Sequence, residues 1–346
     1  FKQKTAYEIR LSLVGSEMCI RDRDIRKPFV GVASCWNEAA PCNTALMRQA
    51  HAASMGVKEA DGTPREFCTI TVTDGIAMGH EGMRSSLVSR DVIADSVELT
   101  IRGHSYDALV GVAGCDKSLP GMMMAMLRLN VPAVFIYGGS ILPGRFEGKD
   151  VTVLDVFEAV GAHAAGSSEM TTAKLEALEK IACPGDGACG GQFTANTMAC
   201  VSEAIGLALP MSSALPAPYL ERDQYCVESG RAVMRLIEQN IRPRDICTRE
   251  AFENAAVVVA ATGGSTNAAL HLPAMAHECG VKFDLKDMAE IFAKTPYIAD
   301  LKPGGNYVAK DFGEAGGVPM LMKTLYDAGL IHGHCMTVTG KTMAEN

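Results

Sequence analysis

The sequence predicts an α/β fold, organised as a three-layer α/β/α domain around a largely parallel sheet. Short apolar runs alternate with helical patterns along the chain, which is typical of this class. No internal repeat or low-complexity linker interrupts the alternation. The length of 346 residues is sufficient for one large domain with a buried core.

Five apolar runs are expected to form the strands. The first two are a continuous apolar run and a run rich in β-branched residues, as expected of buried strands. The expected strands are residues 29–34, 67–73, 108–113, 131–137 and 255–261.

Helices are expected between these strands. In residues 85–102 the apolar side chains recur at helical spacing, and Gly103 provides a stop signal. The other expected helices are residues 45–55, one opening at Thr152, residues 171–181, one beginning near Phe193, and one that follows residues 263–266 and runs to Cys279.

Composition excludes several classes of partner. A formal net charge of −8 argues against nucleic-acid and anionic-membrane surfaces, and no run of 18 apolar residues could span a bilayer. The 12 cysteines show no compact disulfide framework, and no signal peptide precedes them. We therefore expect neither nucleic acid nor membrane as a partner, and a reducing cytoplasm as the location.

The first 23 residues differ in character from the rest. They carry scattered charges and no clear entry into a strand or helix. We expect residues 1–23 to be a non-native or disordered segment, the alternative being an extended N-terminal arm, and residues 24–346 to form the functional domain.

Chemistry-bearing side chains follow the expected strands. Ligand sites in an open α/β sheet form beyond the carboxyl ends of the strands, and each of the first three strands is followed by a thiol, a carboxylate or both. A further loop, residues 183–191, brings another thiol and several glycines just before a helix. The side chains in question are Cys42, Asp74, Cys115, Asp116, Lys117 and Cys189.

Thiolates on separate loops can hold an iron–sulfur cluster, whereas neighbouring carboxylates suit Mg²⁺. Three thiolates leave one position of the cluster open, and an open iron is a Lewis acid toward a hydroxyl. The spacing alone leaves a second reading open, in which the cysteines are buried structural residues, because no C-x₂-C pair or ferredoxin-like run is present. Likewise, residues 263–266 either cradle a substrate carboxylate or form a tight turn.

The heptapeptide Cys115-Asp-Lys-Ser-Leu-Pro-Gly121 resembles the Cys-Asp-Lys-x-x-Pro-Gly motif of the dihydroxy-acid and phosphogluconate dehydratase family. Further segments resemble the family in the same order along residues 24–346. They are residues 72–79, 187–191, 194–198, 261–268, 302–307 and 337–346.

This resemblance implies a set of ligands. It makes Cys42, Cys115 and Cys189 the ligands of a 2Fe–2S or 4Fe–4S cluster. Asp74, Asp116 and Lys117 match the family's Mg²⁺-binding positions, with the lysine carbamylated. The other cysteines of the domain are expected to be core or surface residues, namely Cys35, Cys68, Cys183, Cys200, Cys226, Cys247, Cys279 and Cys335.

The implied activity is a hydro-lyase reaction on a small-molecule dihydroxy acid, 2,3-dihydroxy-3-methylbutanoate or its pentanoate homologue, in valine and isoleucine biosynthesis. The resemblance also implies a homodimer and a β-rich C-terminal domain, which contributes a Mg²⁺-binding glutamate and a serine base. Neither of these motifs occurs here, so we expect a chain that is inactive alone and has no catalytic base of its own. The alternatives are a sugar-acid or 6-phosphogluconate dehydratase and a non-catalytic cluster-binding fragment.

Overall fold

A four-stranded parallel sheet lies at the centre of the fold in the computed structural model, which describes residues 22–346. Its strand order is β2-β1-β3-β4, and a separate antiparallel pair joins β5 to β6. The expected α/β class with a parallel sheet is therefore confirmed. The strands are β1 (Phe29–Ser34), β2 (Thr63–Cys68), β3 (Ala108–Ala113), β4 (Ala133–Tyr137), β5 (Gly144–Phe146) and β6 (Lys149–Val151).

Helices surround this sheet and make up most of the remaining regular structure. The long ones are α3 (Leu46–Glu59), α5 (Ser86–Gly103), α6 (Ser118–Leu129), α7 (Val153–Ala164), α8 (Thr172–Glu179), α9 (Thr194–Ala204), α10 (Glu221–Gln239), α12 (Arg249–Ala261), α13 (Ala268–Cys279), α14 (Leu285–Phe292) and α16 (Gly317–Asp327). The short ones are α2 (Asp22–Ile25), α4 (Asp74–Ala77), η1 (Glu81–Ser85), α11 (Pro243–Ile246) and α15 (Ala309–Glu314). Of the segment 1–23 that was expected to be non-native, residues 1–21 lie outside the described residues.

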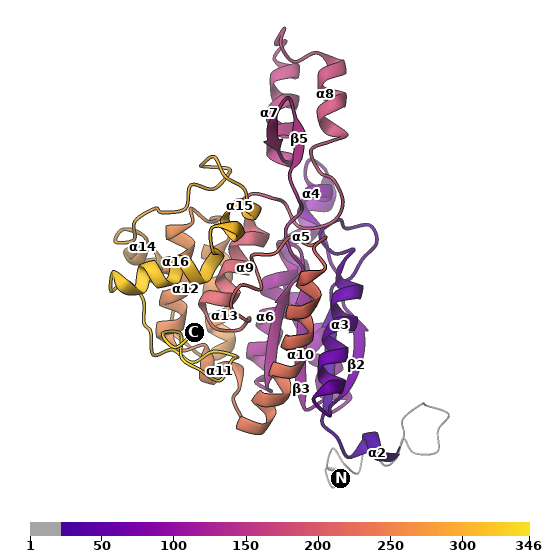
Figure 1. Cartoon of the computed structure of the whole chain (residues 1–346), viewed down its shortest axis with the longest axis vertical. Coiled ribbons are helices and arrows are strands. Elements are labelled where there is room, and N and C mark those ends of the chain that lie inside the picture. Colours follow the sequence, from indigo (N-terminus) through magenta and orange to yellow (C-terminus); the bar gives the residue numbers. More distant parts are fainter. Residues whose placement is uncertain (1–21) are drawn as a thin grey trace.

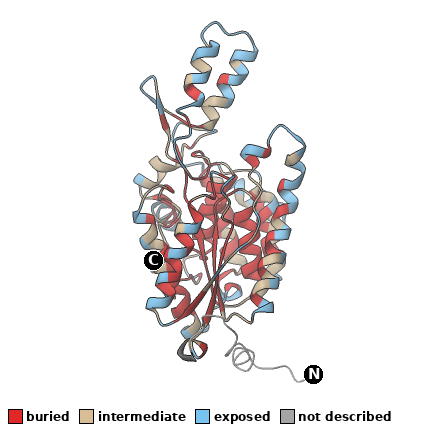
Figure 2. Ribbon diagram, turned by 90° about the vertical axis from the view of Figure 1, so that its right-hand side faces the viewer, coloured by how far each residue is buried: buried red, intermediate tan, exposed pale blue. Residues whose placement is uncertain are grey.

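The two faces of the sheet are covered by different helix pairs. Helices α3 and α10 pack side by side against one face, and α5 and α6 cover the other (Figure 1). The α3–α10 approach is close, since a Cβ added at Gly230 would lie 2.1 Å from the carbonyl oxygen of Ala53. Helices α9, α12 and α13 pack beyond α6, and the sheet with its inner helix faces forms the buried core (Figure 2).

The methionines of α6 fill the space between this helix and the sheet. Met122, Met123 and Met126 are fully buried, and a Cβ added at Gly111 of β3 would lie 2.5 Å from the Cγ of Met122. Unbranched thioether side chains adapt to such irregular gaps. Helix α6 therefore packs closely against β3, and its first turn lies at the edge of the sheet where β3 ends.

Two of the expected strands are wrong in position or type. Residues 255–261 belong to α12 and not to a fifth strand. All of them but Ala260 are buried, so they form a continuous apolar run, which cannot be told from a buried strand by its pattern. The second strand is residues 63–68 and not 67–73. It is an edge strand, where polar residues such as Arg65 and Glu66 are tolerated, so its pattern is less apolar than that of the central strands.

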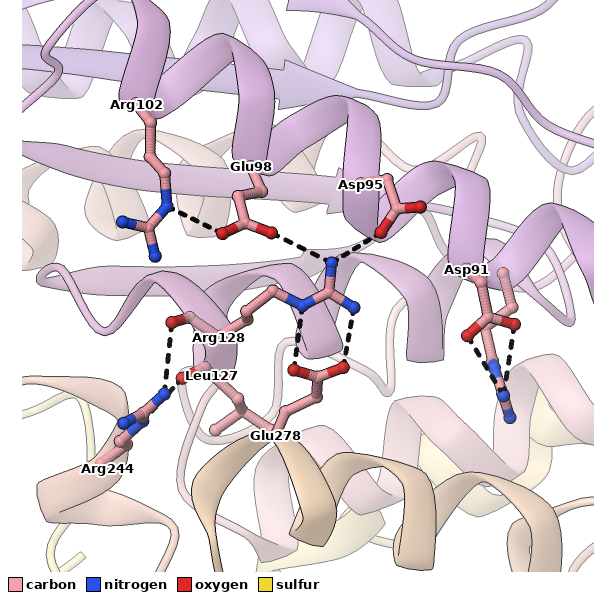
Figure 3. Close-up of polar contacts among 9 residues, drawn as sticks. Asp91, Asp95, Glu98, Arg102, Leu127, Arg128, Arg244 and Glu278 are labelled. Carbon is pink, nitrogen blue, oxygen red and sulfur yellow. Dashed lines mark hydrogen bonds and ion pairs between the residues drawn. The ribbon is translucent and has the colours of Figure 1, made fainter.

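An ion-pair network around Arg128 ties α5, α6 and α13 together (Figure 3). Its guanidinium binds Glu278 through two hydrogen bonds of 2.9 and 2.7 Å and also donates to Asp95 and Glu98. Arg244 donates to the carbonyl oxygens of Leu127 and Arg128 at the end of the same helix. The network holds the C-terminal end of α6, whereas Cys115 precedes its N-terminal end.

Helices α7 and α8 project from the body as a hairpin (Figure 1). The hairpin has a small apolar cluster of its own, formed by Val151, Ala159, Leu178 and Ala182. Within residues 22–346, no helix has the length and apolar character needed to cross a membrane.

Candidate metal and cluster site

The carboxyl ends of β1 and β3 bring two thiols together. In the parallel register, Ser34 at the end of β1 pairs with Val112 of β3, so the loops that follow leave from the same edge of the sheet. Cys42 lies in the loop between β1 and α3, and Cys115 lies between β3 and α6. A Cβ added at Gly114 would lie only 2.0 Å from the carbonyl oxygen of Cys42. The absence of a side chain at Gly114 therefore permits the two loops to touch.

The third thiol reaches this edge on the loop between α8 and α9. The N–H of Gly187 donates to the carbonyl oxygen of Pro41 at 2.9 Å, which joins this loop to the Cys42 loop. Ala188 is bonded to the segment after β4, where it donates to Gly139 and accepts from Ile141. Gly187 has a φ of 126°, which glycine adopts without strain. These bonds hold Cys189 at the same edge as Cys42 and Cys115.

All three thiols are free, and they influence one another. Interaction with the Cys115 thiol, together with burial, raises the pKa of Cys42, and interaction with the Cys42 thiol lowers the pKa of Cys115. Burial, together with the charges of Asp116 and Cys115, raises the pKa of Cys189 to about 12. Three thiolates at this position therefore require a bound cation to offset their charge.

The acidic part of the site is built around a buried ion pair. The Nζ of Lys117 lies 2.6 Å from one carboxylate oxygen of Asp74, and the hydroxyl of Ser86 donates to the other at 2.5 Å. The side chains of Lys117 and Asp74 are only 6% and 8% exposed. Asp74 begins α4 and Lys117 precedes α6, so both are held on rigid backbone.

Asp116 faces the same region from the start of α6. Burial and the neighbouring Asp74 carboxylate raise the pKa of Asp116 to about 6, against the opposing effects of Lys117 and of hydrogen bonds from Ala195 and Thr194. The first turn of α9 lines the same cavity as Asp116. Two carboxylates whose charges oppose each other are suited to a divalent cation.

One cavity of about 440 Å³ joins the thiols to the carboxylates. Five of the six residues predicted from the sequence line it, and Lys117 lies behind Asp74 as its ion-pair partner. The lining residues that carry the argument are Cys42, Asp74, Cys115, Asp116 and Cys189.

The donor set suits a cluster better than a single metal ion. No group of three or more His, Cys, Asp or Glu side chains in residues 22–346 surrounds a common point closely enough for a single metal ion. An iron–sulfur cluster spreads its thiolate ligands over several iron atoms, so three convergent thiols on one cavity wall fit it. Two carboxylates alone are too few for a protein cage of Mg²⁺, but this ion keeps several waters and needs only one or two carboxylates.

The sequence reasoning missed several polar side chains next to the site. Ser86 donates to Asp74, and Thr194 lines the same cavity as Asp116, yet hydroxyls within helix patterns carry no signal of their own. The side-chain amide of Asn267 donates to the Thr194 hydroxyl at 2.8 Å and faces the cavity. The loop of residues 263–266 forms a turn between α12 and α13, with Gly263 at a φ of 60°, and so positions Asn267.

Comparison with known proteins identifies close relatives. The chain is 73% identical to the dihydroxy-acid dehydratase of Pelagibacter ubique over 325 residues, which cover 94% of this chain and 56% of that protein. It is 73% identical to the enzyme of Parvibaculum lavamentivorans over 329 residues, covering 95% and 57%, and 54% identical to that of Mycobacterium tuberculosis over 349, covering 99% and 60%. The chain thus spans somewhat more than half the length of these relatives.

A family model described as "Dihydroxy-acid/6-phosphogluconate dehydratase N-terminal" matches residues 27–346, which is nearly the whole described part of the chain. The chain therefore belongs to the N-terminal domain family of the dihydroxy-acid and 6-phosphogluconate dehydratases.

Proposed function

We propose that this chain forms the cluster- and Mg²⁺-binding part of a dihydroxy-acid dehydratase. The full protein would convert 2,3-dihydroxy-3-methylbutanoate and 2,3-dihydroxy-3-methylpentanoate to their 2-keto acids, in valine and isoleucine biosynthesis. One observation carries the proposal: three free thiols and an Asp74–Lys117–Asp116 cluster meet at one cavity at the carboxyl edge of the sheet. The close relatives named as dihydroxy-acid dehydratases favour these substrates over sugar acids.

Cys42, Cys115 and Cys189 would hold the iron–sulfur cluster, 2Fe–2S or 4Fe–4S. With three protein thiolates, such a cluster supplies an open iron that acts as a Lewis acid toward the departing hydroxyl. The thiols and the carboxylates line the same cavity. A substrate bound there would direct its C3 hydroxyl toward the thiols and its carboxylate and C2 hydroxyl toward Asp74 and Asp116.

Asp74, Asp116 and a carbamylated Lys117 would hold Mg²⁺. Carbamylation forms a bond between the Nζ and CO₂ with release of two protons, one from the ammonium and one on addition to CO₂, which replaces a cation by an anionic oxygen donor. Lys117 already contacts Asp74, so such an oxygen would lie beside the carboxylates. Asp74 is oriented by the Ser86 hydroxyl, which fixes this carboxylate before substrate binds.

The overall reaction removes the C2 proton and the C3 hydroxyl as water, and the resulting enol tautomerises to the 2-keto acid. The resemblance to the family implies a serine base outside residues 24–346. We therefore expect this chain to bind the cluster without turnover. We also propose that the full protein is cytoplasmic, since the described cysteines are all free thiols, as in a reducing compartment. The resemblance to the family supports a homodimer.

The test compares Cys115→Ser with Cys226→Ser after anaerobic reconstitution of the chain with iron and sulfide. Cys226 is also fully buried but lies on α10, away from the cavity. We expect Cys115→Ser to lose the visible absorbance of the cluster and Cys226→Ser to retain it. Equal absorbance in both variants would contradict the ligand assignment.

The substrate is tested with a protein extended to the full length of the relatives. Turnover of 2,3-dihydroxy-3-methylbutanoate without turnover of 6-phosphogluconate is the expected result, and the reverse preference would contradict the proposed substrate.

A further inference from the structure

The loop that carries Cys189 has no regular structure, so its position must be fixed by contacts from elsewhere. Before Cys189 it is held by the backbone bonds of Gly187 and Ala188. Beyond that point, the carbonyl oxygens of Cys189 and Gly191 both accept hydrogen bonds from one group, the Nδ2 of Asn196, at 2.7 and 2.6 Å. A single side-chain amide therefore spans the backbone of the candidate ligand.

The orientation of this amide is determined by its surroundings. The Oδ1 of Asn196 accepts a hydrogen bond of 2.6 Å from the Tyr137 hydroxyl. Turning the amide over would direct Oδ1 at two carbonyl oxygens, which is repulsive, so only one orientation satisfies all partners. Asn196 is 4% exposed and Tyr137 is fully buried, so water does not compete for these bonds.

Tyr137 is itself held at the end of β4. The buried Arg222 of α10 donates to the Tyr137 carbonyl oxygen, and its guanidinium carbon lies 5.4 Å from the centre of the Tyr137 ring. The chain of contacts thus runs from Arg222 through Tyr137 and Asn196 to the Cys189 backbone. It starts from two rigid elements, a strand and a helix of the core.

Asn196 belongs to the same helical turn that serves the acidic part of the site. Thr194 and Ala195, the residues just before it in α9, line the cavity together with Asp116 and lower the pKa of that carboxyl. The turn is fully buried, so it has little freedom to tilt. One turn of one helix therefore contacts the thiol loop and lines the cavity that holds a candidate Mg²⁺ ligand.

We infer that Asn196 is a positioning residue, whose side-chain amide holds the Cys189 loop so that the thiol faces the cavity at a fixed place relative to Asp116. This inference rests on the proposed function, in which Cys189 is a cluster ligand. Asn196 touches neither substrate nor reacting atoms in this role. It acts through the Cys189 backbone.

The experiment uses Asn196→Asp, which keeps the size of the side chain but replaces the two N–H donors by an oxygen facing two carbonyl oxygens. Tyr137→Phe is the second variant, because it removes only the hydroxyl that orients Asn196. Asn254→Asp is the matched control. Asn254 is a fully buried amide on α12 that donates to the His332 carbonyl oxygen at 2.9 Å, away from the cavity.

Two quantities are measured: the rate at which an iron chelator bleaches the reconstituted chain, and the hydrogen exchange of the backbone amides of residues 187–191 in the metal-free chain. Removing an outer partner of a metal ligand commonly weakens the site about 10- to 100-fold, so we expect bleaching to accelerate by about that factor in Asn196→Asp. Tyr137→Phe should change the bleaching rate and the hydrogen exchange in the same direction as Asn196→Asp does, but by a smaller factor. Asn254→Asp should change neither.

Bleaching and exchange in Asn196→Asp that match those of Asn254→Asp would overturn the inference. If Asn196→Asp does not fold, Tyr137→Phe decides by the same comparison. If the unaltered chain takes up no cluster, the proposed function fails by itself. The exchange of residues 187–191 then still decides whether Asn196 holds the Cys189 loop.

Discussion

Lys117 and Asp74 form a buried ion pair, with 2.6 Å between the Nζ and the nearer carboxylate oxygen. The Asp74 carboxylate also accepts a hydrogen bond from the Ser86 hydroxyl. Replacing Lys117 by methionine would leave a buried carboxylate with that single hydrogen bond. In Mg²⁺-free buffer we expect the free energy of unfolding, measured with urea, to fall by about 3 to 5 kcal/mol.

The control for this prediction is Lys310→Met. Lys310 pairs with Glu314 four residues later on a helix surface, where Glu314 is 63% exposed, and such pairs contribute about 0.5 kcal/mol or less. A loss in Lys117→Met no larger than that in Lys310→Met would contradict the prediction. Adding Asp74→Asn to Lys117→Met should restore part of the lost stability, because the unpaired charge is then removed.

Gly114 is the residue that permits the Cys42 and Cys115 loops to touch. A methyl group there would lie 2.0 Å from the Cys42 carbonyl oxygen, and backbone cannot move aside as a flexible side chain can. We expect Gly114→Ala to lower the free energy of unfolding by about 1 to 3 kcal/mol and to reduce cluster uptake in reconstitution.

Gly103→Ala is the matched control for this change. A Cβ at Gly103, the last residue of α5, meets no heavy atom within 4 Å. Alanine favours helix over glycine, so stability should stay the same or rise slightly. If Gly114→Ala changes the free energy of unfolding no more than Gly103→Ala does, the close approach of the two loops does not require glycine at position 114.

The central strands could be predicted from the sequence, whereas an edge strand and a buried helix could not. Residues 29–34 and 108–113 were predicted to the residue as β1 and β3, because central parallel strands buried on both faces are continuous apolar runs. The edge strand β2 and the buried helix α12 were misplaced or misassigned. In β2 the apolar run is short. In α12 residues 255–261 are nearly all buried and apolar, so the sequence shows no helical alternation there.

Position after the strands marked Cys42, Asp74, Cys115 and Asp116 as candidates but left structural cysteines as an alternative, and the resemblance to the family supplied the ligand set. The structure brings five of the six predicted residues to one cavity. Asn196 and Tyr137 could not be recognised as partners of Cys189 from pattern alone. They are 59 residues apart in the chain, and only the fold brings the end of β4 to the first turn of α9, where their side chains meet.

The Arg128 network makes a separate prediction about stability. Arg128 contacts three carboxylates from two other helices, and these carboxylates raise the pKa of the guanidinium, chiefly through the hydrogen bonds to Glu278. Arg128→Ala would remove the bidentate pair and leave like charges close together. We expect a loss of about 1.5 to 3 kcal/mol in the free energy of unfolding, decreasing as salt is added. Lys323→Ala, which removes a single exposed pair with Asp327, should cost about 0.5 kcal/mol or less, and an equal cost in both variants would contradict the network's role.

Glu203 predicts how stability changes with pH. Burial raises the pKa of Glu203 from 4.5 to about 7, against the opposing hydrogen bonds from Ser213 and Met211. Because the folded state holds this proton more tightly than the unfolded state, the stabilisation is fully present below pH 4.5 and is lost as the pH rises through about 7. At 1.36 kcal/mol for each unit of pKa, the change across this window is about 3 kcal/mol.

The measurement is the difference in free energy of unfolding between the unaltered chain and Glu203→Gln, determined with urea at several pH values from 4.5 to 8. The glutamine does not titrate, so the difference cancels the other groups that titrate in the same range. It should shift in favour of the glutamine variant as the pH rises. Glu290→Gln on the exposed surface of α14 serves as the control and should give a much flatter difference. A flat difference for Glu203→Gln as well would mean that Glu203 enters the folded core already charged, with the backbone donors of Met211 and Ser213 fully offsetting its burial.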